Sequence, residues 1–406
     1  MKVHIAVVTG QEIANLLPFL AVQPNNIVLL ISNHMSAKQA VLEKLIAQTP
    51  KLSNVTIKCF PDLPDSNIRA IEDYALNVSE QLEALYPEAE FIYDLTGGSK
   101  LMAIALAAVF TGDNYSQIYL NTENNLLEYV EPRDKPSEQL NTLIDAKTYL
   151  TINGATWRHA LSENLDWQDK IAARQLLTMN FAKMLSTHTK DMENFVRQLN
   201  RAASLSSDKH KGLYAPDQKL DFVPKACRSV MQDIADSGMV DWYPDKGKAI
   251  TFINEDAVNY LNGGWLEEYF YLVSQQVGLD DSHCSVKFID TTIRKSDNHN
   301  ELDGLCAFNN RLLIAECKTL KIGLDQQKDN NILYKMDSIA SHIGGQFCTK
   351  LLLSALPVDH VTRDKRKVNV SDRAKSIEVN VLAGKDVLAL KTHLEQWKNS
   401  GKWLSV

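Results

Sequence analysis

The first 131 residues alternate between short apolar runs and longer stretches in which apolar residues recur at helical spacing. The runs are typical of buried strands, and the stretches are typical of helices that pack on one face. Strands are predicted at 3–8, 27–31, 55–59, 90–94 and 117–120, and helices at 11–20, 36–48, 66–86 and 99–110. This alternation indicates a parallel sheet covered by helices, extended by a hairpin strand at 126–130. Ligands of such sheets bind beyond the carboxyl ends of the strands.

The pattern changes after residues 132–136, which have the composition of a linker. The stretch 158–206 is mostly helical in spacing. A helix at 223–236 then precedes two short strands within 240–254. This is the order of a winged helix, and a helical connector followed by a hairpin explains it equally well.

A mixed sheet flanked by helices is predicted after Gly263-Gly264. Helices are expected at 265–277, 327–343 and 384–398, and strands at 284–292, 301–308, 311–317, 347–354 and 376–382. The fold class is therefore α/β throughout, apart from the middle segment. The predicted domains are 1–135, a ligand-binding sheet domain, 136–262, a helical connector, and 263–406, a second sheet domain.

The composition fits folded domains, with 406 residues of which 45% are hydrophobic and 23% charged. The six cysteines form no C-x-x-C pair, so neither a zinc knuckle nor a disulfide framework fits. The longest apolar run, Leu101–Phe110, is well short of the ~20 residues of a membrane helix. We therefore expect a soluble cytoplasmic protein without a membrane partner.

Charge is unevenly distributed between the two ends of the chain. Residues 1–150 carry 10 Lys and Arg against 18 Asp and Glu, and the rest carries 33 against 32. This excludes a bulk basic footprint for nucleic acid, so any such contact must be local or assisted by a metal. The densest basic run, from Arg363 to Lys375, suits a phosphate backbone, although a solvated loop is the commoner meaning.

The most informative residues are acids on two consecutive predicted strands. Asp303 lies on the first strand, and Glu316 and Lys318 share one face of the second, because side chains at i and i+2 point the same way. Carboxylates hold a hard divalent cation through oxygen, and such a cation lowers the pKa of a bound water and neutralises an attacked phosphate. Lys318 would orient or help deprotonate that water. The arrangement predicts a metal-dependent nuclease, whereas an exposed hairpin with a surface salt bridge is the structural alternative.

The helix predicted before these strands offers a further acid. Trp265, Tyr269 and Leu272 fall at helical spacing and should face the core. Glu267 is then the better acid to reach the metal cluster, with Glu268 as its rival. A solvated helix face explains either acid alone equally well.

A glycine-containing loop joins a predicted strand to a helix in the first domain. Asp94-Leu95-Thr96-Gly97-Gly98-Ser99-Lys100 allows backbone N–H groups and a helix N-terminus to approach an anion. Thr96, Ser99 and Lys100 are able to donate to phosphate or ribose. The loop has neither the Walker pattern nor G-x-G-x-x-G, so the sequence does not support an ATPase or a dehydrogenase.

The carboxylate and lysine set resembles the PD-(D/E)xK restriction-endonuclease-like superfamily, with Leu302 where proline often stands. The chain resembles the CRISPR-associated nucleases that fuse a CARF sensor to such a nuclease. The resemblance lies in the order of its parts: a Rossmann-like half, then Gly-Gly-Trp-Leu-Glu, then Glu-x-Asp-Gly and finally Glu-x-Lys. The resemblance implies catalytic Glu267, Asp303, Glu316 and Lys318, the three acids holding Mn²⁺ or Mg²⁺. It implies RNA or DNA cleavage activated by cyclic tetra-adenylate bound across a homodimer in type III CRISPR defence. The implied activator ligands are Thr9, Gly10, Gln11, Asn15, Thr96, Gly97, Gly98, Ser99 and Lys100.

Two other functions compete with the activated nuclease. A ligand-responsive transcription regulator would use the possible winged helix and an inactive nuclease fold. Intact Asp303, Glu316 and Lys318 favour the enzyme, and the predicted recognition segment carries only Lys225 and Arg228 as bases. An enzyme that only degrades the activator lacks an obvious general base in the N-terminal loops.

Overall fold

The structure, a computed structural model, describes residues 1–185, 190–208, 212–246, 248–290, 299–320, 326–345, 348–361 and 367–403. Its contacts divide the chain into two compact units, Met1–Asn153 and Gly154–Val406. Within the described residues, no helix combines the length and the apolar character needed to cross a bilayer.

The first unit is built on a seven-stranded sheet in the order β3-β2-β1-β4-β5-β6-β7. Its strands are β1 (Lys2–Val7), β2 (Asn26–Ser32), β3 (Thr56–Leu63), β4 (Glu90–Asp94), β5 (Tyr115–Asn121), β6 (Leu126–Glu131) and β7 (Glu138–Gln139). Its helices are α1 (Glu12–Val22), α2 (Ser36–Gln48), α3 (Ile68–Leu85), α4 (Lys100–Val109) and α5 (Ala146–Ile152). The strands from β1 to β5 run parallel, and β6 and β7 are antiparallel, as the hairpin prediction requires.

The order of the strands places two loops side by side. Strand order reverses at β1, which pairs with β2 on one side and β4 on the other. The loops that follow β1 and β4 therefore leave the same edge of the sheet from neighbouring strands, which is where ligands of such folds bind.

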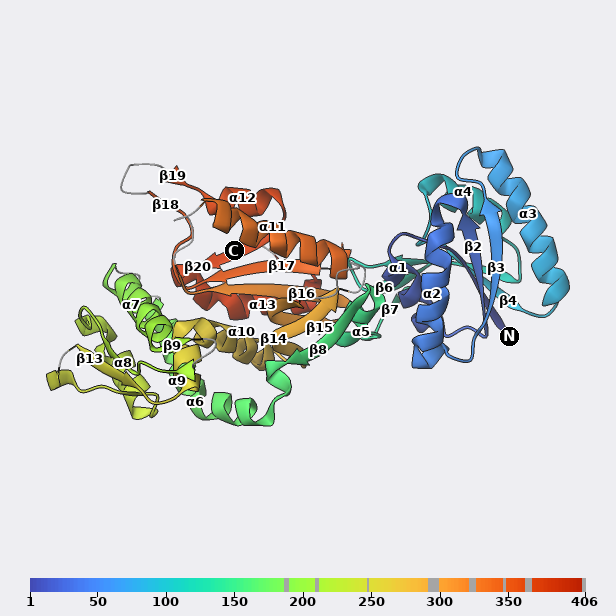
Figure 1. Cartoon of the computed structure of the whole chain (residues 1–406). Helices are drawn as coiled ribbons and strands as arrows, with labels where there is room; N and C mark the ends of the chain where they lie inside the picture. The colour runs from blue at the N-terminus through green and yellow to red at the C-terminus, as the bar shows by residue number, and fades with distance from the viewer. Residues whose placement is uncertain are drawn as a thin grey trace. The chain divides into compact units, whose positions relative to one another are not determined.

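The second unit is built on a six-stranded mixed sheet in the order β20-β17-β16-β15-β14-β8. Its strands are β8 (Ala155–Ala160), β14 (Asp281–Asp290), β15 (His299–Phe308), β16 (Arg311–Lys318), β17 (Cys348–Ser354) and β20 (Val379–Ala383). Helices α10 (Trp265–Gln276) and α13 (Leu390–Ser400) cover one face, and α11 (Gln326–Ile343) and α12 (Val370–Ser376) cover the other (Figure 1). A separate pair, β18 (His360–Val361) and β19 (Lys367–Val368), stands beside the sheet.

The segment predicted as a connector, 136–262, is divided between the two units. Strand β7 and helix α5 belong to the first unit, whereas β8 is the edge strand of the second sheet. The prediction of helix over 158–160 is wrong, because these residues pair with β14, a contact that local spacing does not reveal.

The remaining elements between 161 and 264 pack with the second unit. They are α6 (Leu165–Met184), α7 (Lys190–Ser206), β9 (Ser207–Asp208), β10 (Gly212–Leu213), β11 (Asp217–Lys219), α8 (Arg228–Asp236), β12 (Val240–Asp241), β13 (Ala249–Phe252) and α9 (Glu255–Asn259). Strands β11, β13 and β12 form an antiparallel sheet in that order, and α8 lies between β11 and β12 in the sequence. This order of elements is that of a winged helix.

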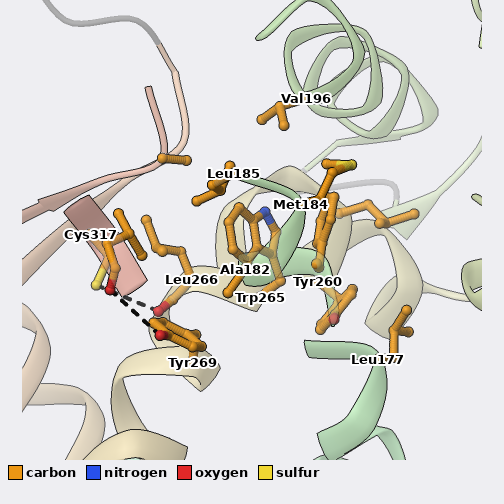
Figure 2. Packing of buried hydrophobic residues seen from close by; sticks show 14 of the residues in the cluster. Leu177, Ala182, Met184, Leu185, Val196, Tyr260, Trp265, Leu266, Tyr269 and Cys317 are labelled. Atoms are coloured by element: carbon orange, nitrogen blue, oxygen red, sulfur yellow. Dashed lines mark hydrogen bonds between the residues drawn. The ribbon is translucent and has the colours of Figure 1, made fainter. Parts of the chain in front are cut away.

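Trp265 lies at the centre of the core shared by these helices and the second sheet. It is fully buried and lies near Ala182, Leu185 and Tyr260, as Figure 2 shows, with its ring 4.4 Å from that of Phe181. Tyr269 and Leu272 are also buried, so the predicted core face of this helix is confirmed. Burial of this face fixes the rotation of α10 and leaves Glu267 on the opposite side.

Candidate active site

Asp303, Glu316 and Lys318 meet where β15 and β16 stop pairing. The ladder ends at Gly304 opposite Ala315. Beyond that point the Asp303 carboxylate replaces a backbone carbonyl as the hydrogen-bond acceptor, and it accepts the backbone N–H of Cys317 at 2.7 Å. The Nζ atom of Lys318 lies 2.6 Å from Glu316 Oε1 and 3.5 Å from Asp303 Oδ2, so the ammonium joins the two acids.

The alternation predicted for β16 is confirmed. Ala315 and Cys317 are buried in the core, whereas the side chains of Glu316 and Lys318 are 18% and 29% exposed on the other face. These values are low for an exposed surface salt bridge. The charged groups therefore lie in a partly desolvated site, where their interactions are stronger than in water.

Burial and mutual repulsion shift the pKa values of this cluster. Burial, with the nearby Glu316 carboxylate, raises the pKa of Asp303 to about 6, although Lys318 opposes the shift. Burial alone would lower the pKa of Lys318, but Asp303 and Glu316 more than offset it and raise the pKa of this lysine. Lys318 is therefore held protonated between the two acids.

Helix α10 supplies the third acid, and the two rival glutamates are directed differently. The side chain of Glu267 accepts a 2.7 Å hydrogen bond from Ser285 Oγ and lies within electrostatic reach of Asp303. Burial, and then Asp303, raise the pKa of Glu267 to about 8. Glu268 is buried instead against Arg174 of α6, whose guanidinium also pairs with Asp256.

Glycines allow the close approach of α10 to this end of the sheet. A Cβ atom on Gly304 would lie 2.4 Å from the ring of Phe270, so only glycine fits beside Asp303. Gly263 has a φ of 136°, a conformation open to glycine, and forms part of a π-helical turn, Tyr260–Gly264, that leads into α10. Sequence reasoning used Gly304 only as part of a motif and Gly263 as a domain boundary and part of a motif. It missed Ser285 and Arg174 because their partners are distant in sequence.

The donor chemistry of this cluster suits a divalent cation. Asp303 lies within electrostatic reach of both Glu267 and Glu316, and the pKa values of Asp303 and Glu267 are raised, which is the electrostatic condition that a hard cation relieves. Among the described residues, no group of three or more Asp, Glu, His or Cys side chains is arranged closely enough to hold a metal ion as it stands. The ammonium of Lys318 lies in contact with both Asp303 and Glu316.

The two predicted activator loops of the first unit are in contact. A Cβ atom on Gly97 would lie 2.5 Å from the Val7 carbonyl oxygen and 2.8 Å from the Thr9 side chain. Glycine at position 97 thus lets the β4 loop pack directly on the β1 loop. Gly10 and Gly98 flank this contact, and both are exposed.

Hydrogen bonds hold the β4 loop in its shape. Thr96 donates its backbone N–H to Asp94 Oδ1 at 2.8 Å, and its hydroxyl oxygen accepts the N–H of Leu120 at 2.9 Å. Ser99 caps α4 by accepting the backbone N–H of Met102. Lys100 is exposed at the first position of this helix. The loop therefore presents an exposed helix N-terminus with a lysine beside it.

The β1 loop is held from below by Asn15. This side chain is fully buried, donating to the Val7 carbonyl oxygen at 2.8 Å and accepting the N–H of Thr9 at 3.0 Å. Thr9 in turn donates its hydroxyl to the Gln11 carbonyl oxygen. Gln11 is exposed, whereas Asn15 lies beneath the loop that it supports.

The fold and the site together define a restriction-endonuclease-like nuclease unit joined to a Rossmann-like sensor unit. Residues 3–149 match the family model of Card1 CARF domains, and residues 254–401 match that of Card1-like endonuclease domains. The chain belongs to the CRISPR-associated nucleases that combine a CARF domain with an endonuclease domain. No curated protein sequence matches the chain.

Solved structures of low sequence identity share this fold. Protein VC1899 from Vibrio cholerae is 20% identical, with a TM-score of 0.75 over 99% of both chains. Can2 from Sulfobacillus thermosulfidooxidans, solved in complex with cyclic tetra-adenylate, is 18% identical, with a TM-score of 0.72 over 98% of this chain and 97% of that one. A type III CRISPR defence DNA nuclease activated by cyclic oligoadenylate is 14% identical, with a TM-score of 0.50 over 87% of this chain and 45% of that one.

Proposed function

We propose that this endonuclease is metal-dependent and is switched on by cyclic tetra-adenylate in type III CRISPR defence. The observation that carries the proposal is the convergence of Glu267, Asp303, Glu316 and Lys318 at one end of the nuclease sheet. The substrate is a nucleic acid, DNA or RNA, and the place of action is the cytoplasm.

Glu267, Asp303 and Glu316 would hold Mn²⁺ or Mg²⁺ through oxygen. When bound, such a cation lowers the pKa of a coordinated water and neutralises charge on the phosphate. Lys318 would stabilise negative charge on the phosphate rather than act as a base, because its pKa is raised by the neighbouring acids. The basic run would contribute through Lys367, Arg373 and Lys375, while residues 362–366 of that run lie outside the described part of the chain.

The activator would bind where the loops after β1 and β4 meet. Thr9, Gly10 and Gln11 form one side, and the loop 96–100 forms the other. Backbone N–H groups at an exposed helix N-terminus suit the phosphates of a cyclic oligonucleotide, and Lys100 adds a charge there. Asn15 would act by supporting the first loop. The fold shared with Can2, which was solved with cyclic tetra-adenylate, supports this choice of ligand.

A homodimer would complete the activator site, since a symmetric cyclic ligand suits a two-fold axis. Helix α4, which begins at the activator loop, is apolar around much of its surface, and Ile104 is 66% exposed on it. Burying this face against a second copy would remove apolar area from water. Light scattering should give a dimer for the wild type without ligand, and Ile104→Glu should give a monomer. A wild-type monomer with and without ligand would overturn the dimer.

The decisive experiment compares cleavage by the wild type, Asp303→Asn and Glu316→Gln. Plasmid DNA, single-stranded DNA and single-stranded RNA are each incubated with Mn²⁺ or Mg²⁺, with and without cyclic tetra-adenylate. We expect activator-dependent cleavage by the wild type only, with activator affinity unchanged in both variants because the acids lie in the second unit. Cleavage by both variants at the wild-type rate would remove the proposed active site.

A transcription regulator is the second candidate, because the order β11-β13-β12 is that of a winged helix. The gathered acids and Lys318 argue against an inactive nuclease. Activator-dependent binding of a specific duplex by Glu316→Gln, without cleavage of any substrate by the wild type, would favour the regulator.

A further inference from the structure

Ser285 has an unusual backbone for a residue inside a long strand. Its φ is 49°, in the left-handed region that residues with a side chain rarely adopt. Strand β14 pairs with β15 on both sides of it, through Cys284 opposite Gly304 and Val286 opposite Leu302, in one unbroken register. By that register Ser285 lies opposite Asp303, and this single pair is missing from the ladder.

The local distortion brings the Ser285 hydroxyl to Glu267. Its Oγ atom donates to Glu267 Oε2 at 2.7 Å, and the Cys284 thiol lies 4.0 Å from the same oxygen. A carboxylate held through one oxygen has its rotation fixed and presents the other oxygen in a set direction. Glu267 lies on a helix and Asp303 on a strand, so one contact from β14 orients the acid of a different element.

A purely local cause does not explain serine at this position. Asn309 and Asn310 also have positive φ, and they form the turn between β15 and β16, where asparagine is favoured. Ser285 lies within β14, where no turn requires a positive φ. Strained backbone at a candidate active site, combined with a hydrogen bond to a proposed ligand, is the pattern expected of a constraint kept for function.

We propose that Ser285 is a positioning residue that orients Glu267 toward Asp303 and Glu316, so that three carboxylates rather than two bind the cation. The proposal rests on the metal site of the proposed function. Some residues hold a metal ligand in place by a hydrogen bond. Mutation of such a residue typically lowers the metal affinity by about 10- to 100-fold.

The test separates the hydroxyl from the backbone. Mn²⁺ affinity of the full chain, without nucleic acid, is measured by calorimetry for Ser285→Ala and Ser285→Gly. Both lose the hydroxyl, whereas only glycine adopts a φ of 49° without strain, so Ser285→Gly should have the higher melting temperature of the two. We expect both to bind Mn²⁺ about tenfold more weakly than the wild type.

Two controls make the result specific. Ser282→Ala removes another buried hydroxyl of the same strand, which bonds to the Leu279 carbonyl oxygen and not to Glu267, so its Mn²⁺ affinity should match the wild type. In a Glu267→Gln background, Ser285→Ala should cause no further loss, because its effect passes through Glu267. Mn²⁺ affinities of Ser285→Ala and Ser285→Gly within twofold of the wild type would overturn the proposal.

The two levels of the hypothesis fail in different ways. If Asp303→Asn and Glu316→Gln bind Mn²⁺ as the wild type does, the metal site itself is wrong. If those variants lose Mn²⁺ while the Ser285 variants keep it, the metal site stands and only the positioning role is lost.

Discussion

The side chain of Glu267 combines a proposed metal-binding role with a cost to stability in the metal-free protein. Its pKa is raised to about 8, so the folded state favours its protonated form. The pKa of this acid is higher in the folded than in the unfolded chain. The free energy of unfolding therefore falls as the pH rises from the ordinary pKa of glutamate, ~4.3, to the folded-state pKa of about 8. Glu267→Gln should therefore raise the melting temperature at pH 8.5 by about 2–4 °C, corresponding to about 1 kcal/mol, and give no gain at pH 4.

The same shift makes metal binding pH-dependent. A cation must displace the protons held by Glu267 and Asp303, whose pKa values are about 8 and about 6. We expect Mn²⁺ affinity to rise steadily between pH 6 and pH 8.5, with proton release detectable by calorimetry in buffers of different ionisation enthalpy. In Glu267→Gln the dependence above pH 7 should disappear. An affinity that is constant from pH 6 to 8.5 in the wild type would contradict this account.

Gly304 shows how a residue without a side chain supports the site. Alanine here would place a Cβ atom 2.4 Å from the Phe270 ring, so helix α10 or strand β15 must move. Overpacking of this kind costs about 1–3 kcal/mol, and Gly304→Ala should lower both the free energy of unfolding and Mn²⁺ affinity. Adding Phe270→Leu should recover part of both losses, because the smaller side chain leaves room. Simple additivity in this double-mutant cycle would refute the contact.

At the scale of elements, a buried ion pair holds α10 against α6. The Arg174 guanidinium is 7% exposed and bonds to Glu268 of α10 and Asp256 of α9, and it also lies over the ring of Tyr260. Arg174→Met should cost about 3–5 kcal/mol of unfolding free energy, because it leaves Glu268 buried without its partner. The exposed pair of Lys170 and Asp166 on the same helix is the matched control, where Lys170→Met should leave the free energy of unfolding nearly unchanged, because solvent screens an exposed ion pair. Chemical denaturation measures both.

The sequence predicted an element well where the spacing of apolar residues determines its structure. It predicted an element poorly where the structure depends on pairing with a segment far away in the chain. Spacing of two along a strand placed Glu316 and Lys318 on one face, and helical spacing placed Trp265 in the core. Strand β8 was missed because its pairing with β14 joins residues far apart in the chain. Helical spacing favoured Glu267 over Glu268, but it did not predict the contacts with Ser285 and Arg174 that direct the two side chains differently.

At the scale of the whole molecule, the proposed activation must cross from one compact unit to the other. The chain leaves the first unit at Asn153 and enters the second at Gly154, directly before β8. Strand β8 pairs with β14, and β14 carries Ser285 beside Glu267. A change at this junction therefore reaches the proposed metal ligands through one pair of strands. The activator would shift the equilibrium between an inactive and a cleavage-competent state if it binds the competent state more tightly. A hundredfold tighter binding corresponds to a difference of about 2.7 kcal/mol in binding free energy.

An insertion at the junction tests whether this covalent route carries the signal. Four Gly and Ser residues placed between Asn153 and Gly154 would make the connection flexible and leave both sites intact. We expect activator affinity and Mn²⁺ affinity to remain within twofold of the wild type, while the ratio of cleavage rates with and without cyclic tetra-adenylate falls at least tenfold. The control is Thr96→Ala with Lys100→Ala, which should raise the activator concentration needed for cleavage and leave the maximal rate unchanged. An insertion variant with the wild-type activation ratio would show that the signal bypasses β8, and contacts between two copies of the chain would then have to carry it.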